Sequence, residues 1–332
     1  MEDIQEAFSR NWIAPLGFNC DAFEEEVVAY LGTSYHSLCL NAGTSALHLA
    51  VKLAGIGRGD IVLCSDMTFA ATANPICYEG GVPVFIDCER DTWNMDPEAL
   101  ENAFLKYPNA KAVMLAHLYG TPSKMDEIVA ICKKHGAVLI EDAAEAIASE
   151  YKGVKCGTFG KYGVLSFNGN KLITTSGGGM LLCDNKEDRD KALFLATQAR
   201  EKAPWYQHEV IGYNYRMSNV VAGIGRGQLL HVNEHKKLKK QIYDRYSKGL
   251  GELPVTMNPY LKDTAPNFWL SCMTVNEGCS VNPLSVMEKL AEHNVEARPL
   301  WKPMHMQPVF KDCGFVTACG NPVDEDLFKR GL

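Results

Sequence analysis

Long apolar runs are missing from the chain: none of its segments approaches the roughly 18 residues that a membrane-spanning helix needs. The N-terminal residues also lack the pattern of a signal peptide. Positive charge is in short supply, because 33 lysines and arginines against 40 aspartates and glutamates leave a net charge of −7. Nucleic acids and anionic membranes bind basic patches, so neither is expected as a partner. We therefore expect a soluble, cytoplasmic protein.

Paired metal and redox motifs are also absent. The twelve cysteines form no C-x-x-C pair and are scattered singly, often inside apolar runs such as those of Cys64, Cys132 and Cys183. That pattern is typical of small buried side chains in a reducing compartment, not of a disulfide framework or a zinc site. His231 and His235 have a spacing that can hold a metal on one helix face, but the adjacent glutamate of H-E-x-x-H is missing. No metal site is expected.

Nucleotide-cofactor fingerprints are missing as well. No G-x-G-x-x-G follows the first predicted strand. The glycines of segment 55–59 follow a predicted helix and are typical of the end of a helix. A Walker A pattern does not occur. These absences weaken the reading of the chain as an NAD-dependent oxidoreductase.

The chain does contain buried strands separated by helices. Apolar segments without polar alternation cover residues 61–64, 82–87, 112–115 and 137–140. Together with the intervening helical patterns they predict a parallel α/β sheet covered on both faces. Polar residues follow three of these strands, at Asp66, His117 and Asp142. Because ligands bind beyond the carboxyl ends of parallel strands, this edge is the expected site.

The pattern changes in the last third of the chain. Two helical stretches fill the first 35 residues, and a long helical segment runs from residue 218 to about residue 250. Beyond Gly251 the chain shows short strands near 271–275 and a helix over 283–293. We expect a large domain of residues 1–230 and a smaller C-terminal α+β domain of residues 231–332.

A lysine-bearing loop is the most informative stretch. The sequence SFNGNK at 166–171 lies between apolar runs that predict two buried strands, 163–165 and 180–182. Desolvation lowers the pKa of a lysine, and a neutral lysine amine attacks carbonyls, among which pyridoxal phosphate is the usual partner. A single hairpin lysine more often points into water, so the assignment of Lys171 depends on other residues.

Two further features suit this cofactor. The helix that begins at Gly43-Thr44-Ser45 offers free N–H groups and a positive dipole end to a phosphate, although simple N-capping explains the same residues. Asp142, at a strand end, can keep the pyridine nitrogen protonated so that the ring draws electrons from a substrate carbanion. Its alternative role is a helix N-cap.

Six motifs occur in order along the chain. They are NAGTSAL at 41–47, TFAATAN at 68–74, HLYG at 117–120, EDAA at 141–144, SFNGNK at 166–171 and GYNYRM at 212–217. Together they resemble the DegT/DnrJ/EryC1/StrS family of nucleotide-sugar aminotransferases, and the resemblance covers nearly the whole chain. It implies the fold type I architecture of pyridoxal phosphate enzymes: a mostly parallel central sheet in a large cofactor-binding domain plus a smaller C-terminal α+β domain.

The resemblance also implies roles at the cofactor ring. Lys171 would carry pyridoxal phosphate as an aldimine and shuttle a proton, Asp142 would pair with the ring nitrogen, and Phe69 would stack on the ring. Relatives often have glutamine or histidine where this chain has Glu145, near the ring hydroxyl. A carboxylate beside a phenolate is repulsive unless one of them is protonated, so this contact of Glu145 requires a proton on one of the two groups.

Phosphate and subunit contacts follow from the same resemblance. The phosphate would be held by Gly43, Thr44, Ser45 and Ser166. Asn214 would reach the phosphate of a partner subunit, which implies a homodimer with shared active sites.

The resemblance implies a transaminase, because Lys171 is present where dehydrating relatives have histidine. Glutamate would donate its amino group to a nucleotide-linked 4-keto-6-deoxyhexose for surface glycan or O-antigen assembly, with UDP-2-acetamido-4-keto sugars of the UDP-N-acetylbacillosamine type favoured. Alternatives are a GDP-perosamine synthase type, a 3-keto-sugar aminotransferase, or a non-catalytic regulator that binds the cofactor.

The implied sugar-nucleotide contacts lie in two segments. The candidate residues are Trp12, Ile13, Ala14, Pro15, Trp301, Lys302 and His305. Core packing or surface exposure would explain each of them equally well. Because relatives normally continue beyond a stretch like 328–332, the smaller domain is expected to be truncated at its end.

Overall fold

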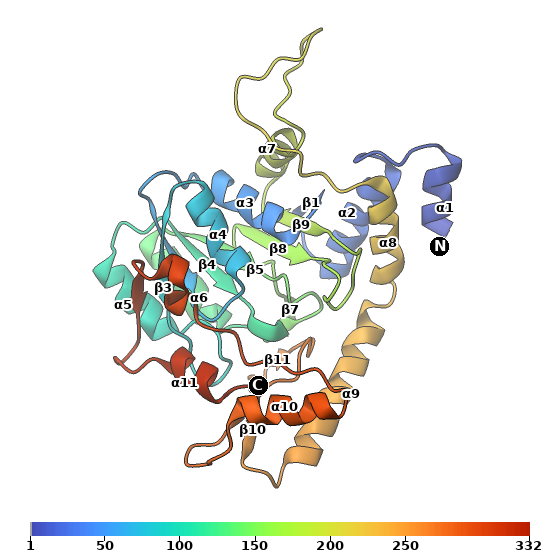
Figure 1. The fold of residues 1–332 in the computed structure, drawn as a ribbon. Coiled ribbons are helices and arrows are strands. Elements are labelled where there is room, and N and C mark those ends of the chain that lie inside the picture. Colours follow the sequence, from blue (N-terminus) through green and yellow to red (C-terminus); the bar gives the residue numbers. More distant parts are fainter. Residues whose placement is uncertain (1) are drawn as a thin grey trace.

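A large mixed sheet forms the centre of the computed structural model, which describes residues 2–332 (Figure 1). Its strand order is β1-β9-β8-β5-β4-β2-β3-β13. The strands are β1 (His36–Leu40), β2 (Ile61–Ser65), β3 (Val82–Ile86), β4 (Ala112–Ala116), β5 (Val138–Asp142), β8 (Tyr162–Ser166), β9 (Gly179–Cys183) and β13 (Gly314–Val316). The α/β class with a mostly parallel sheet is confirmed. Among these strands only β9 runs antiparallel to its neighbours.

Helices cover both faces of the sheet (Figure 1). They are α1 (Glu2–Ser9), α2 (Phe18–Leu31), α3 (Gly43–Leu53), α4 (Ala70–Tyr78), α5 (Pro97–Lys106), α6 (Met125–His135), α7 (Lys186–Ala196), α8 (Asn219–Leu229), α9 (Val232–Leu250), α10 (Pro283–Glu292) and α11 (Val323–Arg330). Within residues 2–332, no helix is both long enough and apolar enough to span a membrane.

Burial on both faces explains the uninterrupted apolar strands. In β2, Val62 and Cys64 pack in the core under α3, α4 and α7, whereas Leu63 packs on the opposite face with α5 and α6. Near β8 and β9 that opposite face is covered by α2 and α8. Alternate residues of a strand point to opposite faces, so a strand buried on both sides must be apolar throughout.

The predicted helix over 218–250 is two helices. After α8, Leu230 is exposed, and the His231 N–H bonds to the carbonyl of Gln228, three residues back. This tighter turn interrupts the i to i−4 hydrogen-bond ladder, and α9 begins at Val232 with His231 as its N-cap. The apolar pattern alone carries no signal for such a break.

The C-terminal part contributes to two regions. After α9, the short strands β10 (Val255–Met257) and β12 (Met273–Val275) pair antiparallel, and α10 follows. The chain then passes through the 3-10 turns η2 (Met304–Met306) and η3 (Pro308–Phe310) to β13, which pairs in parallel with β3 in the main sheet. The predicted division into two domains at residue 230 stays a prediction. β13 belongs to the predicted smaller domain by its position in the chain, but it pairs within the large sheet. Three minor strands, β6 (Glu150–Tyr151), β7 (Val154–Lys155) and β11 (Thr264–Ala265), form a separate small sheet.

A buried ion-pair cluster joins the N-terminal helices to the motif at 212–217. Glu24 of α2 accepts hydrogen bonds from the Cys39 N–H (2.8 Å), from Arg216 Nη1 (2.8 Å) and from Arg189 Nη2 (2.6 Å). The side chains of Glu24 and Arg216 are each only 7% exposed. Removal of one partner would leave a buried charge with fewer compensating contacts.

We expect Arg216→Leu to lower the free energy of unfolding by about 3 kcal/mol, because breaking a buried ion pair leaves an uncompensated charge. Chemical denaturation measures this. Arg298→Leu is the matched control, since its partner Glu296 and Arg298 itself are largely exposed and such pairs contribute about 1 kcal/mol or less. Equal losses in the two variants would contradict the role of burial.

Candidate active site

One large cleft of about 1240 Å³ lies at the carboxyl ends of β4, β5 and β8. Most of the residues predicted to hold the cofactor line it: Gly43, Thr44, Phe69, Asp142, Glu145, Ser166 and Lys171. The opposite wall consists of α9, β10, β12 and α10, with apolar side chains such as Leu250, Val255 and Leu290. The cleft therefore lies between the main sheet and the smaller C-terminal elements.

Lys171 reaches the cleft from the loop between β8 and β9. The Lys171 N–H bonds to the Asn168 carbonyl at 3.0 Å, which fixes the turn. Its Nζ lies 3.4 Å from Glu145 Oε1 and 4.2 Å from the ring centre of Trp269, and its side chain is 12% exposed. The amine is thus held between a carboxyl group and an aromatic face, and it does not point into bulk water.

Asp142 is the last residue of β5 and is buried. Its Oδ2 accepts a hydrogen bond from Thr72 Oγ1 at 2.6 Å, and its Oδ1 accepts one from the Ala144 N–H at 3.1 Å. Thr72 Oγ1 is in turn 2.6 Å from Thr68 Oγ1. The residues after Asp142 form turns and not an α-helix, so the carboxylate is oriented into the cleft without capping one.

Glu145 is buried beside Lys171. Its Oε2 accepts a hydrogen bond from the Tyr119 N–H at 2.7 Å, while its Oε1 faces the lysine amine. Burial raises the pKa of Glu145 to about 7; the charge of Lys171 lowers it, and Asp142 raises it further. A carboxyl group with this pKa is partly protonated near neutral pH, and in that form it can donate a hydrogen bond to a phenolate without repulsion.

Stability is expected to depend on pH through Glu145. The folded pKa lies above the ordinary value of 4.5, so folding takes up a proton between about pH 4.5 and pH 7, and the free energy of unfolding falls as pH rises through that window. On protein stripped of cofactor, Glu145→Gln should gain on the order of 2 kcal/mol relative to wild type between pH 5 and pH 8. Denaturation at both pH values measures it. The exposed Glu127→Gln serves as control, and parallel curves for wild type and Glu145→Gln would contradict the shift.

The N-terminus of α3 provides a seat for an anion. Its N-cap residue, Ala42, makes no side-chain capping bond, so the first N–H groups of the helix are not occupied by a cap. A Cβ on Gly43 would lie 3.0 Å from the Ser166 Cβ, so glycine permits the close approach of the helix to the end of β8. Free N–H groups, the helix dipole and the hydroxyl of Ser166 form a donor set that fits a phosphate.

Two aromatic side chains form another wall. Phe69 is 61% exposed, a large fraction for phenylalanine, and its ring centre lies 5.6 Å from that of Trp301. Trp301 also packs edge-on against Tyr119, whose hydroxyl accepts a hydrogen bond from the Trp301 N–H. A planar ligand ring can stack on the exposed face of Phe69. Lysine, carboxylate, phosphate seat and aromatic face together fit pyridoxal phosphate.

Several predicted residues do not line this cleft. Asn214 is exposed in the segment between α7 and α8, where it pairs with Thr197 and its Oδ1 accepts a hydrogen bond from Gln198 Nε2. This segment forms the loop that projects beyond α7 (Figure 1). Trp12 bonds to the Leu16 carbonyl in an exposed N-terminal segment. Both ring nitrogens of His305 face carboxylates outside the cleft. The residues outside the lining are Trp12, Ile13, Ala14, Pro15, Ser45, Asn214, Lys302 and His305.

Three site residues had no assigned role in the sequence. Thr72 orients Asp142, Trp269 lies under Lys171, and Tyr119 contributes both its N–H to Glu145 and its hydroxyl to Trp301. Thr72 and Tyr119 fall inside the motifs at 68–74 and 117–120, and this position in a motif is the one sequence feature that could have indicated a role for them. Trp269 lies outside every motif, and only the fold brings it to the lysine.

Comparison with known proteins identifies the family. The family model described as "DegT/DnrJ/EryC1/StrS aminotransferase family" matches residues 1–332. EpsN of Bacillus subtilis (strain 168), which is assigned as a pyridoxal phosphate-dependent aminotransferase, is 48% identical over 335 residues, with 99% of this chain and 86% of EpsN covered. A GDP-perosamine synthase of Caulobacter vibrioides is 35% identical over 96% of this chain and 86% of the relative.

A solved structure agrees with this result. The DegT DnrJ EryC1 StrS aminotransferase from Brucella abortus superposes with a TM-score of 0.90 at 27% identity, covering 99% of this chain and 88% of that chain. This chain belongs to the DegT/DnrJ/EryC1/StrS aminotransferase family and is a pyridoxal phosphate-dependent sugar aminotransferase.

Proposed function

We propose that the protein transfers the amino group of glutamate to the C4 carbonyl of a nucleotide-linked 4-keto-6-deoxyhexose for surface glycan synthesis, with a UDP-2-acetamido-4-keto sugar as the favoured acceptor. The observation that carries this proposal is that Lys171, Asp142 and the free N-terminus of α3 all line one cleft.

Each residue has a distinct task in the proposed reaction. When bound, pyridoxal phosphate supplies a ring that draws electrons from the substrate carbon. Lys171 holds the cofactor and then moves a proton to or from that carbon. Asp142, fixed by Thr72, keeps a proton on the ring nitrogen. Glu145 in its protonated form donates a hydrogen bond at the ring hydroxyl.

The remaining contacts position the cofactor. Phe69 stacks on the ring, and the phosphate is held by Gly43, Thr44, Ser45 and Ser166. The Ser45 hydroxyl already donates to Asn41 Oδ1 at 2.7 Å, so the donor that Ser45 would offer the phosphate is its backbone N–H.

The size of the cleft supports a large acceptor. Pockets for small molecules usually measure about 300–1,000 Å³, and this cleft of about 1240 Å³ exceeds that range. Its part beyond the cofactor residues runs along Trp301 and the wall of β10, β12 and α10. A nucleotide-linked sugar requires such an extended site. We propose Trp301 as a contact of this substrate; Lys302 follows it in the chain but does not line the cleft.

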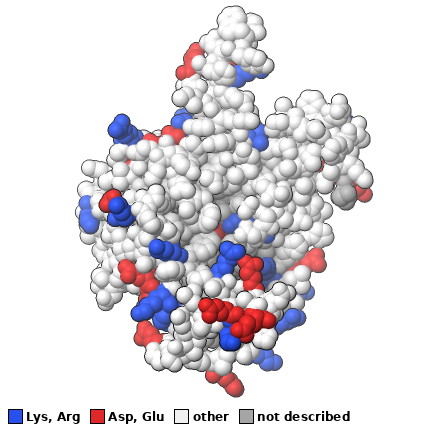
Figure 2. Space-filling model, in the orientation of Figure 1, with Lys and Arg blue, Asp and Glu red and all other residues white. Residues whose placement is uncertain are grey.

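The proposed dimer accounts for residues outside the cleft. Exposed apolar side chains lie on the N-terminal segment and the projecting loop: Phe8, Trp12, Ile13, Leu16, Trp205, Tyr206 and Ile211. Figure 2 shows charged side chains gathered over the C-terminal elements, whereas the face over α7 and the loop carries few. We propose that these apolar segments join two subunits, which would bring Asn214 and residues 12–15 to the partner's cleft. Light scattering on the purified protein tests this, and a monomer would contradict it.

A second acceptor class is favoured by the relatives. GDP-perosamine synthases from Caulobacter vibrioides, Escherichia coli O157:H7 and Vibrio cholerae are 33–35% identical to this chain. A GDP-linked 4-keto-6-deoxymannose is therefore the second candidate acceptor, ahead of a 3-keto sugar.

The decisive experiment offers glutamate and a panel of UDP-, GDP- and dTDP-linked keto sugars to the purified enzyme. We expect glutamate alone to discharge the visible absorbance of the bound cofactor, and one 4-keto sugar to restore it with formation of an amino sugar detected by mass spectrometry. No discharge by glutamate and no conversion of any sugar would favour the non-catalytic regulator instead.

A further inference from the structure

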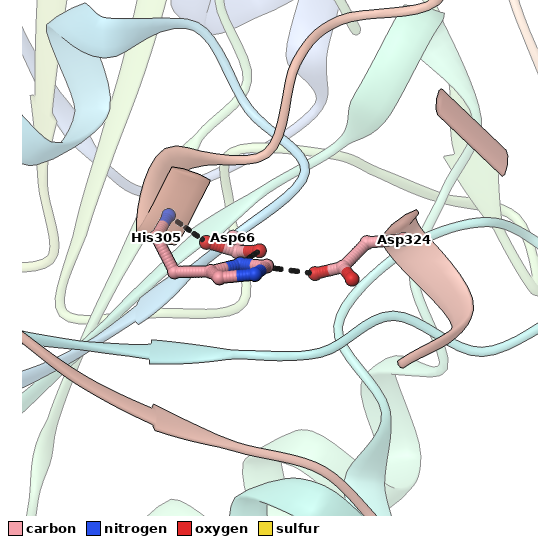
Figure 3. Close-up of side chains that lie close together, drawn as sticks. All are labelled: Asp66, His305 and Asp324. Atoms are coloured by element: carbon pink, nitrogen blue, oxygen red, sulfur yellow. Dashed lines mark hydrogen bonds and ion pairs between the residues drawn. The ribbon is translucent and has the colours of Figure 1, made fainter. Parts of the chain in front are cut away.

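A second polar cluster lies outside the cleft and has no part in the proposed reaction. It brings together Asp66 after the end of β2, His305 in η2 and Asp324 in the first turn of α11 (Figure 3). Asp66 and Asp324 are 0% exposed, and the His305 side chain is 15% exposed. The three side chains converge although they are separated by up to 258 positions, as the sequence numbering shows.

The geometry of the cluster is compact. His305 Nδ1 lies 2.6 Å from Asp66 Oδ2 and 3.9 Å from Asp324 Oδ2, and one donor atom of each residue lies within 4.8 Å of the others. Figure 3 shows the imidazole between the two carboxyl groups. Ligand atoms around a tetrahedral ion with bonds of about 2.0–2.1 Å are roughly 3.3 Å apart, so shifts of less than about 1 Å would bring all three to one ion.

One carboxyl oxygen in this cluster has an ion-pair contact with His305 but no hydrogen bond. Asp324 Oδ2 is buried and has no hydrogen-bond partner among the described residues, whereas its Oδ1 accepts from the Glu325 N–H at 2.7 Å. A buried polar atom without a partner is costly, and a second buried carboxylate beside it adds repulsion. Asp87 adds a third buried carboxyl group next to Asp324, since it accepts the N–H groups that begin α11. The cluster thus places three buried carboxyl groups around one imidazole, and their negative charge would be offset by a proton held within the cluster or by a bound cation.

The histidine is oriented as a ligand. Its Nε2 lies 3.2 Å from Glu325 Oε1, which suits donation of the Nε2 proton to that carboxylate. Without an ion, the 2.6 Å contact of Nδ1 with Asp66 Oδ2 needs a proton between the two atoms. With the proton on Nε2, Nδ1 would offer its lone pair to a cation that takes the place of this proton. A carboxylate on the far nitrogen is the usual outer partner of a metal-binding histidine. Stacking of the imidazole on Phe315, with ring centres 3.9 Å apart, holds the ring plane.

We propose that Asp66, His305 and Asp324 bind one divalent transition-metal cation, for which Zn²⁺ is the best match. One imidazole nitrogen and two carboxylate oxygens are ligands that Zn²⁺ accepts, with a water completing a tetrahedron. The sequence led us to expect no metal site. The three proposed ligands are far apart in the sequence, so no short spacing motif could have indicated them.

The cation would act as a clamp between distant segments. Asp66 also accepts the His305 N–H at its Oδ1 (2.7 Å), and its carbonyl accepts the Met304 N–H (3.1 Å), so the end of β2 already holds η2. Three residues after Asp66 comes Phe69, and four before His305 comes Trp301, and these two rings are in contact. A bound ion would fix both segments behind the aromatic wall of the cleft, independently of which sugar is the substrate.

The test measures zinc in the intact holoenzyme. Protein is loaded with Zn²⁺, dialysed into metal-free buffer and analysed by plasma mass spectrometry and zinc-edge X-ray absorption. We expect one zinc per chain with nitrogen and oxygen ligands near about 2.0–2.1 Å and no sulfur near about 2.3 Å. Retention of no zinc, or sulfur ligation by some of the twelve cysteines, would overturn the proposal.

Variants assign the ligands. Asp324→Asn keeps the shape of the side chain, and it should abolish zinc retention while far-UV circular dichroism and cofactor content stay as in wild type. Glu325→Gln should weaken zinc affinity by about 10–100-fold, the usual effect of changing an outer partner. His231→Gln is the matched control, because His231 and His235 are the neighbouring histidines that could hold adventitious zinc. Unchanged zinc content in Asp324→Asn, or loss of zinc in His231→Gln, would refute the assignment.

Discussion

Lys171→Ala is expected to abolish transamination. Loss of a positioned general acid–base alone usually lowers a rate by about 10²–10⁴-fold, and this variant also loses the amine that we propose holds the cofactor. The Lys171 side chain is 12% exposed and its amine lies beside Glu145 and Trp269, and no other lysine lines the cleft among the described residues. Turnover with glutamate and the preferred keto sugar measures the loss.

Two readouts separate chemistry from folding in this variant. The visible absorbance of the lysine-bound cofactor should disappear, whereas far-UV circular dichroism should stay unchanged. Lys237→Ala, on the exposed side of α9, should keep both the absorbance and full turnover. A Lys171→Ala protein that retained turnover would refute the proposed reaction.

Asp142→Asn is expected to lower kcat by about 100- to 1000-fold, the range found when one preorganised electrostatic group is removed from an active site. The amide has the same shape as the carboxylate, but it carries no charge to keep a proton on the ring nitrogen. Thr72 Oγ1 can still donate to the remaining oxygen, so the fold should tolerate the change. Steady-state kinetics with glutamate measure the effect.

Position and charge can be separated at this site. Thr72→Val removes the hydrogen bond at 2.6 Å that orients Asp142 but leaves its charge, so we expect a smaller loss than in Asp142→Asn. The buried hydroxyl of Thr68 would then lose its neighbour, and thermal unfolding should be recorded alongside. Equal losses in both variants would show that orientation, not charge, controls the rate.

Much of the sheet was predictable because buried strands carry a strong apolar signal. The segments predicted at 61–64, 82–87, 112–115 and 137–140 all coincide with strands. The reversed direction of β9 had no such signal, since its five buried residues read like those of a parallel strand. β1 and β13 were missed, because β13 is only three residues long and its pairing with β3 depends on a contact across most of the chain.

The candidate site was predictable where a strand end or a motif marks the residue. Asp142 and Lys171 were found from their places after a strand and between two strands, and the structure brings both to one cleft. Trp269 and the partners of His305 could not be found, because contacts between residues more than 90 positions apart leave no pattern in a single sequence. Trp12 and Asn214 lie outside the chain's own cleft, and their predicted contacts would require the second subunit that we propose.

The pairing of β13 with β3 has a consequence for synthesis of the protein. Until residues 314–316 leave the ribosome, β3 is a bare edge whose N–H and C=O groups can pair with another chain. At about 5–20 residues per second, the stretch between the two strands takes roughly 10–50 s to make. Nascent chains are therefore expected to need a chaperone or a covering partner along β3 during that interval.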